Sequence, residues 1–122
     1  MLRKLSFALL LASPSVAAAA ADELDPVPAR AIIGHAYIGE TAPSRILFIN
    51  VRDRPVKIIW IGFDGVERPY ATLNEGQEMV QPTFVGHRWL ARDAGDGDPL
   101  AGFIATRSER RSNGVAEIAI IR

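Results

Sequence analysis

The stretch Gln81–Gly95 reads QPTFVGHRWLARDAG and gathers several of the rarest side chains of the sequence. It contains His87, one of two histidines, and Trp89, one of two tryptophans, together with the hydroxyl of Thr83. Side chains alternate between two faces along an extended strand. These three side chains therefore share a face if the chain stays extended through Gly86. They then form an apolar slot with polar ends or a satisfied part of the core, and the core is the commoner outcome because binding pockets are few per protein.

Short segments rich in β-branched and aromatic residues lie on both sides of this stretch. Strands are expected at 31–38, 45–51, 56–63, 67–71, 86–92, 100–106 and 115–121. The segment 77–84 should lie at a sheet edge or be interrupted, because Pro82 cannot donate to a ladder. Asp64-Gly65 predicts a hairpin, since glycine supplies the positive φ of a type I′ turn. About seven short strands and no amphipathic helix predict an all-β fold, an antiparallel sandwich or barrel.

Two of the expected strands have informative patterns. Residues 45–51 read RILFINV, which is nearly continuous apolar sequence and typical of a central strand. Residues 56–63 read VKIIWIGF and alternate, with Val56, Ile58 and Trp60 on one face.

The N-terminus has the three parts of a secretory signal peptide. A basic start is followed by an apolar run at 5–11 and small residues at 16–21, so residues 1–21 are expected to be removed by cleavage between about Ala19 and Asp22. The apolar run is too short for a stable membrane span, although an uncleaved anchor helix is the alternative. Residues 22–30 contain Pro26 and Pro28 and predict an extended, solvated linker. The domain then covers 31–122, and the expected location is secreted or periplasmic.

Charge and composition exclude several classes of partner. The chain has 14 basic and 14 acidic residues, and removing Arg3 and Lys4 leaves 14 − 2 = 12 basic residues and a net charge of about −2. This balance argues against nucleic acid, because phosphate neutralisation requires a basic surface, and against a polybasic membrane contact. The sequence has no cysteine, so no disulfide is available in an oxidising compartment.

Motifs for catalysis or metal binding are weak. No serine stands in a nucleophile-elbow pattern, and the two histidines, His35 and His87, are far apart. Asp93, Asp96 and Asp98 supply oxygens of the kind that calcium prefers, but they lack the EF-hand spacing, and Asp and Gly are ordinary turn residues. We expect no catalytic residue, metal or cofactor.

An ordered series of motifs gives the sequence a family resemblance. The series runs through SRILFIN at Ser44–Asn50, Trp60, FDG at Phe63–Gly65, PY-x-TL at Pro69–Leu73 and GH-x-WL-x-RDAG at Gly86–Gly95. Its order and spacing closely resemble the β domain of the von Hippel–Lindau (VHL) tumour suppressor family. The resemblance implies a seven-stranded antiparallel β-sandwich, in agreement with the strand pattern.

The resemblance also implies a binding site. In the family this domain binds an extended peptide that contains 4-hydroxyproline. By alignment, Trp60 and Trp89 would form aromatic walls and Tyr70 would supply a hydroxyl. Thr83, where the family has serine, and His87 would hydrogen-bond the ring hydroxyl.

Three functions follow as hypotheses. The leading one is a secreted or periplasmic module that recognises a proline- or hydroxyproline-containing peptide through these residues. The second is a small structural or interaction domain of the cell envelope with no specific small ligand. The third, an enzyme acting on glycans or peptides, requires a carboxylate close to His87. Because no helical α domain follows residue 122, no ubiquitin-ligase partner is expected.

Overall fold

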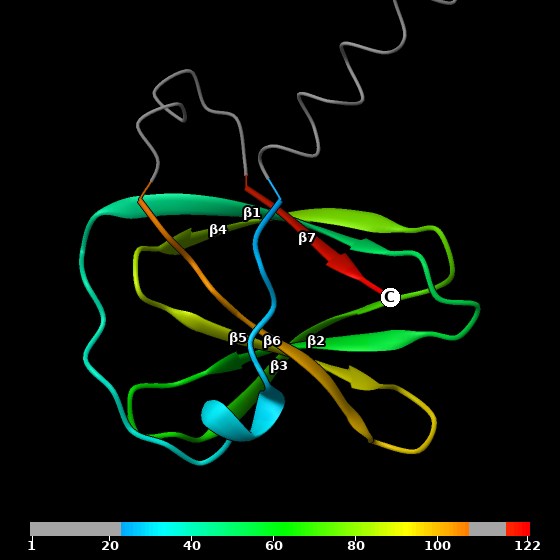
Figure 1. Cartoon of the computed structure of the whole chain (residues 1–122), viewed down its shortest axis with the longest axis horizontal. Helices are drawn as coiled ribbons and strands as arrows, with labels where there is room; N and C mark the ends of the chain where they lie inside the picture. Colours follow the sequence, from blue (N-terminus) through cyan, green and yellow to red (C-terminus); the bar gives the residue numbers. More distant parts are fainter. Residues whose placement is uncertain (1–22, 108–116) are drawn as a thin grey trace, which may run out of the picture.

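The computed structural model describes residues 23–107 and 117–122, so the expected signal peptide lies outside the described residues. The described chain contains seven strands and one short 3₁₀ helix. They are η2 (Ala29–Ala31), β1 (Pro43–Asn50), β2 (Val56–Ile61), β3 (Glu67–Leu73), β4 (Glu78–Phe84), β5 (Arg88–Asp93), β6 (Pro99–Ile104) and β7 (Glu117–Ile121). They form a three-stranded sheet, β4-β1-β7, and a four-stranded sheet, β3-β2-β5-β6 (Figure 1). The predicted seven-stranded β-sandwich is confirmed.

One strand pair departs from the expected antiparallel order. β1 and β7 pair in parallel, with Ile46 opposite Glu117 and Asn50 opposite Ile121. Hairpin connections produce antiparallel neighbours, whereas parallel neighbours require a crossover. Between β1 and β7 the chain forms β4 on one side of β1 and all four strands of the opposite sheet, and β7 then pairs with the other side of β1. The sheet is therefore mixed, and β1 is its central strand, as predicted.

The main core lies between the two sheets and follows the alternation of the strands. Phe48 of β1 packs against Trp89 of β5 and Phe103 of β6, with ring centroids 5.7 and 6.1 Å apart. Val56 and Ile58 of β2 are fully buried in the same cluster. Ile59 and Ile61 face the other side of β2 and belong to a second cluster. The predicted alternation of this strand is confirmed.

The strand expected at 31–38 does not form. Its first residue ends η2, and residues 32–34 form a turn in which Gly34 has φ 73°. Ile32 is buried against Ile59, Ile61 and Leu90 on the outer face of the four-stranded sheet. β propensity depends on packing, and this segment buries its isoleucine as a cover over the sheet.

The segment expected to be a solvated linker packs on the sandwich. Leu24 is buried in the main core, and its backbone N–H donates to Ile118 O of β7 (2.7 Å). Val27 exchanges two backbone hydrogen bonds with Gly102 of β6, at 2.8 and 2.9 Å. This part of the chain therefore crosses from one sheet to the other (Figure 1). Leu24 and Val27 determine this packing. The prolines near them made the segment resemble a solvated linker in the sequence.

The hairpin predicted at Asp64-Gly65 joins β2 to β3, but its turn is not type I′. Gly65 N donates to Gly62 O (2.8 Å), and Gly65 is the residue with positive φ, at 84°. No non-glycine residue in the described chain has positive φ, whereas a type I′ turn requires it at both central positions. Residues 62–66 therefore form a longer connection in which Gly65 adopts the left-handed conformation.

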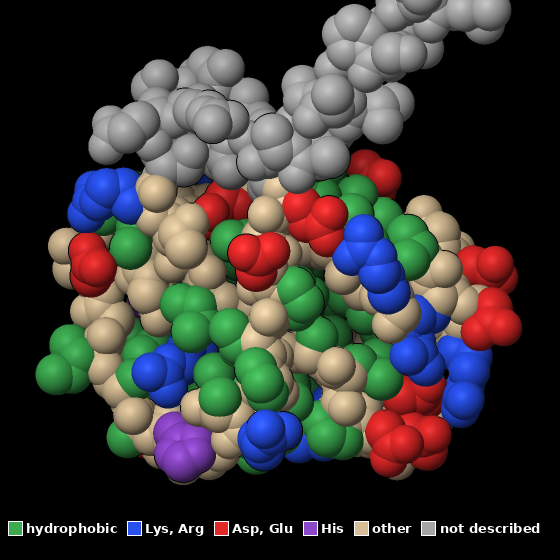
Figure 2. Space-filling view, viewed as in Figure 1, with side chains coloured by type: hydrophobic (Ala, Val, Ile, Leu, Met, Phe, Trp, Pro, Cys, Tyr) green, Lys and Arg blue, Asp and Glu red, His purple; other side chains and the backbone are tan. Residues whose placement is uncertain are grey.

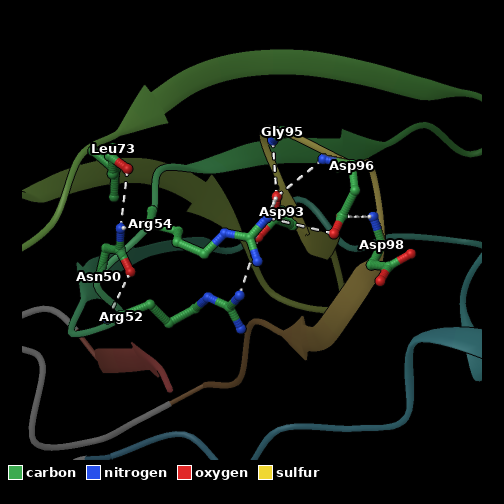
Figure 3. Close-up of polar contacts among 8 residues, drawn as sticks. All are labelled: Asn50, Arg52, Arg54, Leu73, Asp93, Gly95, Asp96 and Asp98. Carbon is green, nitrogen blue, oxygen red and sulfur yellow. Dashed lines mark hydrogen bonds and ion pairs between the residues drawn. The ribbon is translucent and has the colours of Figure 1, made fainter.

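A polar cluster ties together the loops at one end of the sandwich (Figure 3). Asn50 donates from Nδ2 to the backbone oxygens of Arg54 (2.9 Å) and Leu73 (3.0 Å). The Asp93 carboxylate pairs with Arg52 at 3.1 Å and with Arg54 at 3.3 Å. These contacts join the β1–β2 loop to the end of β3 and to the β5–β6 loop.

The two lateral edges of the sandwich differ. At one edge, β6 and β7 are bridged by residues 23–27. At the other edge, β3 and β4 are outer strands of their sheets, and no further strand of the described chain pairs with them. The sandwich is therefore closed along one side and open along the other.

Candidate functional site

An open hollow with a volume of about 200 Å³ lies where β3 and β4 flank the open edge of the sandwich. Its lining comes from four strands and one turn, and comprises Trp60, Tyr70, Pro82, Thr83, Phe84, His87 and Trp89. The structure thus brings together all five side chains that the sequence predicted as site residues. We refer to this hollow as the β3–β4 pocket.

The three residues of the opening stretch converge in a different way from the one expected. The chain does not stay extended through Gly86, which has φ 84° and begins a turn between β4 and β5. Thr83 lies in β4 of one sheet and Trp89 in β5 of the other. The convergence therefore results from the chain crossing between sheets, with His87 in the connecting turn.

Trp89 forms the inner wall of the pocket and is held by a polar contact. Its side chain is 2% exposed, and its Nε1 donates a hydrogen bond to Thr83 Oγ1 at 3.0 Å. The Tyr70 ring meets the Trp89 ring edge-on, with centroids 5.0 Å apart and planes at 80°. Tyr70 itself is 54% exposed. Its hydroxyl therefore stands at the solvent side of a rigid aromatic corner.

His87 is fixed by aromatic neighbours on several sides. Its ring stacks on Trp60, with centroids 5.6 Å apart and planes at 24°. Phe63 meets it edge-on at 5.1 Å, and Phe84 lies tilted at 5.3 Å. An ideal Cβ built on Gly39 would lie 2.9 Å from His87 Cδ2 and 2.6 Å from Phe63 Cε1. Glycine at this position is what allows the loop to pack against the two rings.

The imidazole of His87 is placed to accept a hydrogen bond. Within the described chain its ring nitrogens make no hydrogen bond, so they remain available to a molecule in the pocket. Burial lowers the pKa of His87 from its ordinary value of 6.5, because a low-dielectric environment disfavours the charged form. At neutral pH the ring is therefore uncharged and has one nitrogen lone pair.

Thr83 has hydrogen-bonding capacity to spare. It is 5% exposed, and its oxygen accepts the Trp89 indole hydrogen. A hydroxyl has one donor and two acceptor positions, so the O–H hydrogen and one lone pair remain. Thr83 is thus partly satisfied inside the protein and partly open to a ligand.

The indole nitrogen of Trp60 differs from that of Trp89, which is hydrogen-bonded to Thr83. Trp60 Nε1 is buried without a hydrogen-bond partner. Its interaction with the Tyr37 side chain acts on the pKa of Tyr37. Burial raises the pKa of Tyr37, and the contacts to Arg88 and Trp60 only offset that effect in part. The Tyr37 hydroxyl also donates to Ile61 O and accepts from Arg88 N, which anchors the loop beside Phe63.

A second, shallower hollow adjoins the β3–β4 pocket. It is lined by Glu40, Thr41, Phe63, Phe84 and His87, so two residues line both hollows. Glu40, Thr41 and Phe63 are not among the site residues predicted from the sequence. No local pattern shows that the loop carrying Glu40 and Thr41 packs against His87.

A comparison with protein families bears on this arrangement. Residues 35–105, more than half of the chain, match the family model described as VHL beta domain. The chain belongs to the VHL beta domain family. In the VHL protein this domain is the substrate-recognition module and binds hydroxyproline-containing peptides. The match covers every residue of the β3–β4 pocket, and it agrees with the resemblance drawn from the motifs.

Three further observations on this VHL beta domain concern metal-binding groups, membrane-spanning helices and surface charge. In residues 23–107 and 117–122 no group of three His, Asp or Glu side chains is arranged to hold a metal ion. The helices of the same residues include none that is long and apolar enough to cross a bilayer. On the face shown in Figure 2, Lys and Arg side chains are interspersed with Asp and Glu rather than gathered in a basic patch. The lining of the β3–β4 pocket itself contains aromatic rings, Pro82, and the side chains of Thr83 and His87.

Proposed function

We propose that this chain is a binding module for an extended peptide that contains proline or 4-hydroxyproline, and that it acts as a secreted or periplasmic protein. The observation that carries the proposal is the convergence of Trp60, Tyr70, Thr83, His87 and Trp89 in one pocket at the open edge of the sandwich. Location outside the cytoplasm is supported by the signal-peptide pattern of residues 1–21.

The pocket fits a hydroxylated pyrrolidine ring by shape and by hydrogen-bond direction. Aromatic side chains supply a flat apolar surface for the ring, and Tyr70 places a hydroxyl near a peptide carbonyl. The Thr83 O–H donates to the ligand hydroxyl oxygen, and the ligand O–H donates to the neutral His87 ring. The Trp89–Thr83 bond leaves the Thr83 hydrogen free for this purpose. The ligand hydroxyl then accepts one hydrogen bond from Thr83 and donates one to His87.

Unmodified proline fits the same surface but leaves those two groups unpaired. An unsatisfied buried polar group costs about 1–3 kcal/mol, and sites that bond a ligand hydroxyl discriminate strongly against ligands without it. The site therefore favours hydroxyproline over proline, and its apolar walls retain weaker binding of the unmodified ring.

The test is calorimetric titration with two blocked peptides that differ only in proline against 4-hydroxyproline. We expect tighter binding of the hydroxylated peptide by about tenfold or more, and we expect His87→Ala to remove that preference. His35→Ala is the matched control, because His35 is exposed and does not line the pocket. Circular dichroism and thermal unfolding of both variants establish that the fold is intact.

The alternative function, a structural domain without a small ligand, is favoured by one observation. Thr83 is buried and already bonded to Trp89, as expected of a core residue. Under this alternative neither peptide binds, and His87→Ala lowers the unfolding temperature instead of changing affinity. That pair of results would replace the first proposal with the second.

A further inference from the structure

The hydrogen bonds between β4 and β1 show which backbone groups of β4 point toward the open edge. Asn50 N donates to Gln77 O at 3.0 Å, and Val85 N donates to Ala42 O at 2.9 Å. Both bonds continue the register of the β1–β4 ladder. Hydrogen-bonded and non-bonded pairs alternate along an antiparallel ladder. The odd-numbered residues of β4 therefore bond to β1, and the even-numbered residues turn their N–H and C=O groups toward the open edge.

Two even-numbered residues of β4, Pro82 and Phe84, line the pocket, and each presents fewer free backbone groups to the open edge than an ordinary strand residue. Pro82 has no N–H and offers the edge a carbonyl oxygen alone. Phe84 O already accepts a hydrogen bond from His87 N at 3.1 Å. The Pro82 carbonyl is therefore the outward acceptor beside the pocket that can take a new donor.

That carbonyl is occupied in the free protein by the neighbouring side chain. Gln81 Nε2 donates to Pro82 O at 2.8 Å, and this contact is exposed. A carboxamide N–H is the same kind of donor as a peptide N–H. The Gln81 side chain thus fills the position that a backbone N–H of an added strand would take.

The geometry of a bound proline decides which ligand group reaches this carbonyl. Proline is tolerated in a strand where its nitrogen points away from the neighbouring strand. In an extended chain, the residues on either side of that proline then point their N–H and C=O groups toward β4. The donor to Pro82 is therefore the N–H of a residue adjacent to the ligand proline.

We propose that Gln81 is a specificity-determining residue that caps the Pro82 carbonyl until a peptide N–H displaces it. This inference rests on the proposed function and adds a class of ligand to it. The module selects an isolated proline or hydroxyproline with an N–H-bearing residue beside it. It rejects polyproline segments, because a second proline would take the position of the Gln81 carboxamide without supplying an N–H and would leave Pro82 O without a partner.

The experiment combines variants of Gln81 with backbone-methylated peptides. The probes are alanine-based peptides with one central hydroxyproline, each with N-methylalanine at one of the two flanking positions. Gln81→Ala and Gln81→Glu both remove the competing donor, and Gln81→Glu keeps the shape of the side chain. We expect both to bind the unmethylated peptide about two to ten times more tightly, which corresponds to the net value of one hydrogen bond.

Methylation should separate the two flanking positions. At one of them, N-methylation weakens binding to the unmodified protein and abolishes the gain from both Gln81 variants. Methylation at the other position has a smaller effect. In the nuclear magnetic resonance spectrum, the Gln81 carboxamide hydrogens should exchange slowly in the free protein and faster in the complex. Glu78→Gln is the control, because Glu78 lies on the same edge away from the pocket.

The outcomes distinguish this inference from the function on which it rests. If the hydroxyproline peptide binds in a His87-dependent way but neither Gln81 variant nor methylation changes affinity, the role of Gln81 is overturned and the function stands. Equal binding of an oligoproline peptide would also overturn it. If no peptide binds to any variant, both proposals fail.

Discussion

Thr83 is both a hydrogen-bond acceptor inside the protein and a lining residue of the β3–β4 pocket. Its oxygen holds the Trp89 indole, and its hydrogen is free to point into the β3–β4 pocket. Thr83 could be identified from the sequence, but its bond to Trp89 could not, because the two side chains belong to opposite sheets. The bond explains why a pocket residue is also almost fully buried.

Replacing Thr83 with valine should destabilise the protein through this bond. Valine has nearly the same shape but leaves the buried Trp89 Nε1 without an acceptor, at a cost of about 1–3 kcal/mol. Thr83→Ser retains the oxygen and should stay within about 1 kcal/mol of the unmodified protein. Urea denaturation followed by tryptophan fluorescence measures both changes. Equal stability of the valine and serine variants would show that the indole bond contributes nothing.

Among the elements, the loops differ in how far the sequence reveals them. Residues 93–98 read DAGDGD and were expected to be an ordinary turn, and a turn does form at residues 94–96, directly after Asp93 ends β5. Their central feature, Asp93, is nonetheless 2% exposed and accepts backbone hydrogen bonds from Gly95 (2.8 Å) and Asp96 (3.1 Å). Arg52 and Arg54 reach it from another loop, which no spacing in the sequence indicates (Figure 3).

The pH dependence of this loop cluster follows from the Asp93 carboxylate. Hydrogen bonds from the backbone N–H groups of Asp96 and Gly95, with the charges of Arg54 and Arg52, hold the pKa of Asp93 below its ordinary value of 3.8. A carboxylate whose folded pKa is lowered stabilises the fold above its unfolded pKa. That stabilisation is lost as the pH falls below 3.8 toward the folded pKa.

We therefore expect Asp93→Asn to lower the urea midpoint at pH 7, and the difference from the unmodified protein to shrink as the pH falls below 3.8. The neutral amide keeps the size of the side chain but loses the attraction of two guanidinium groups. Asp53→Asn, an exposed change in the same β1–β2 loop, is the matched control. A difference that stayed constant down to pH 2 would assign the effect to shape rather than charge.

Strands were easier to foresee than the segments that cover them. The alternation of residues 56–61 and the position of Pro82 determine β2 and the edge strand β4 directly. The parallel pairing of β1 with β7 depends on where a distant strand returns, so local sequence contains no sign of it. Likewise, Ile32 and Leu24 lie in segments whose sequences favour a strand and a linker, and only the buried faces that they cover explain their conformation.

At the scale of the whole molecule, the closed edge and the candidate site lie on opposite sides of the sandwich. Residues 23–27 bridge β6 and β7, and an ion pair between Glu23 and Arg122 at 2.7 Å adds to that closure. The β3 and β4 edge stays open and holds the pocket. An edge without a partner presents free backbone groups and is a common site for adding a strand. Closing one edge and leaving the other open directs such pairing to the side that carries the aromatic residues.

This separation predicts that the closed edge can be weakened without loss of binding. Leu24→Ala removes a side chain that is 8% exposed and packed in the main core, which should cost about 2–3 kcal/mol of unfolding free energy. Affinity for the hydroxyproline peptide, measured below the unfolding transition, should change less than twofold. Val51→Ala, at an exposed aliphatic residue, is the control and should alter neither quantity. Leu24 lies on the opposite edge from the pocket, so affinity should not fall together with stability. A parallel loss of both would mean that the two edges are coupled through the core. Trp89 would then be the connecting residue, because it belongs to both the core and the pocket.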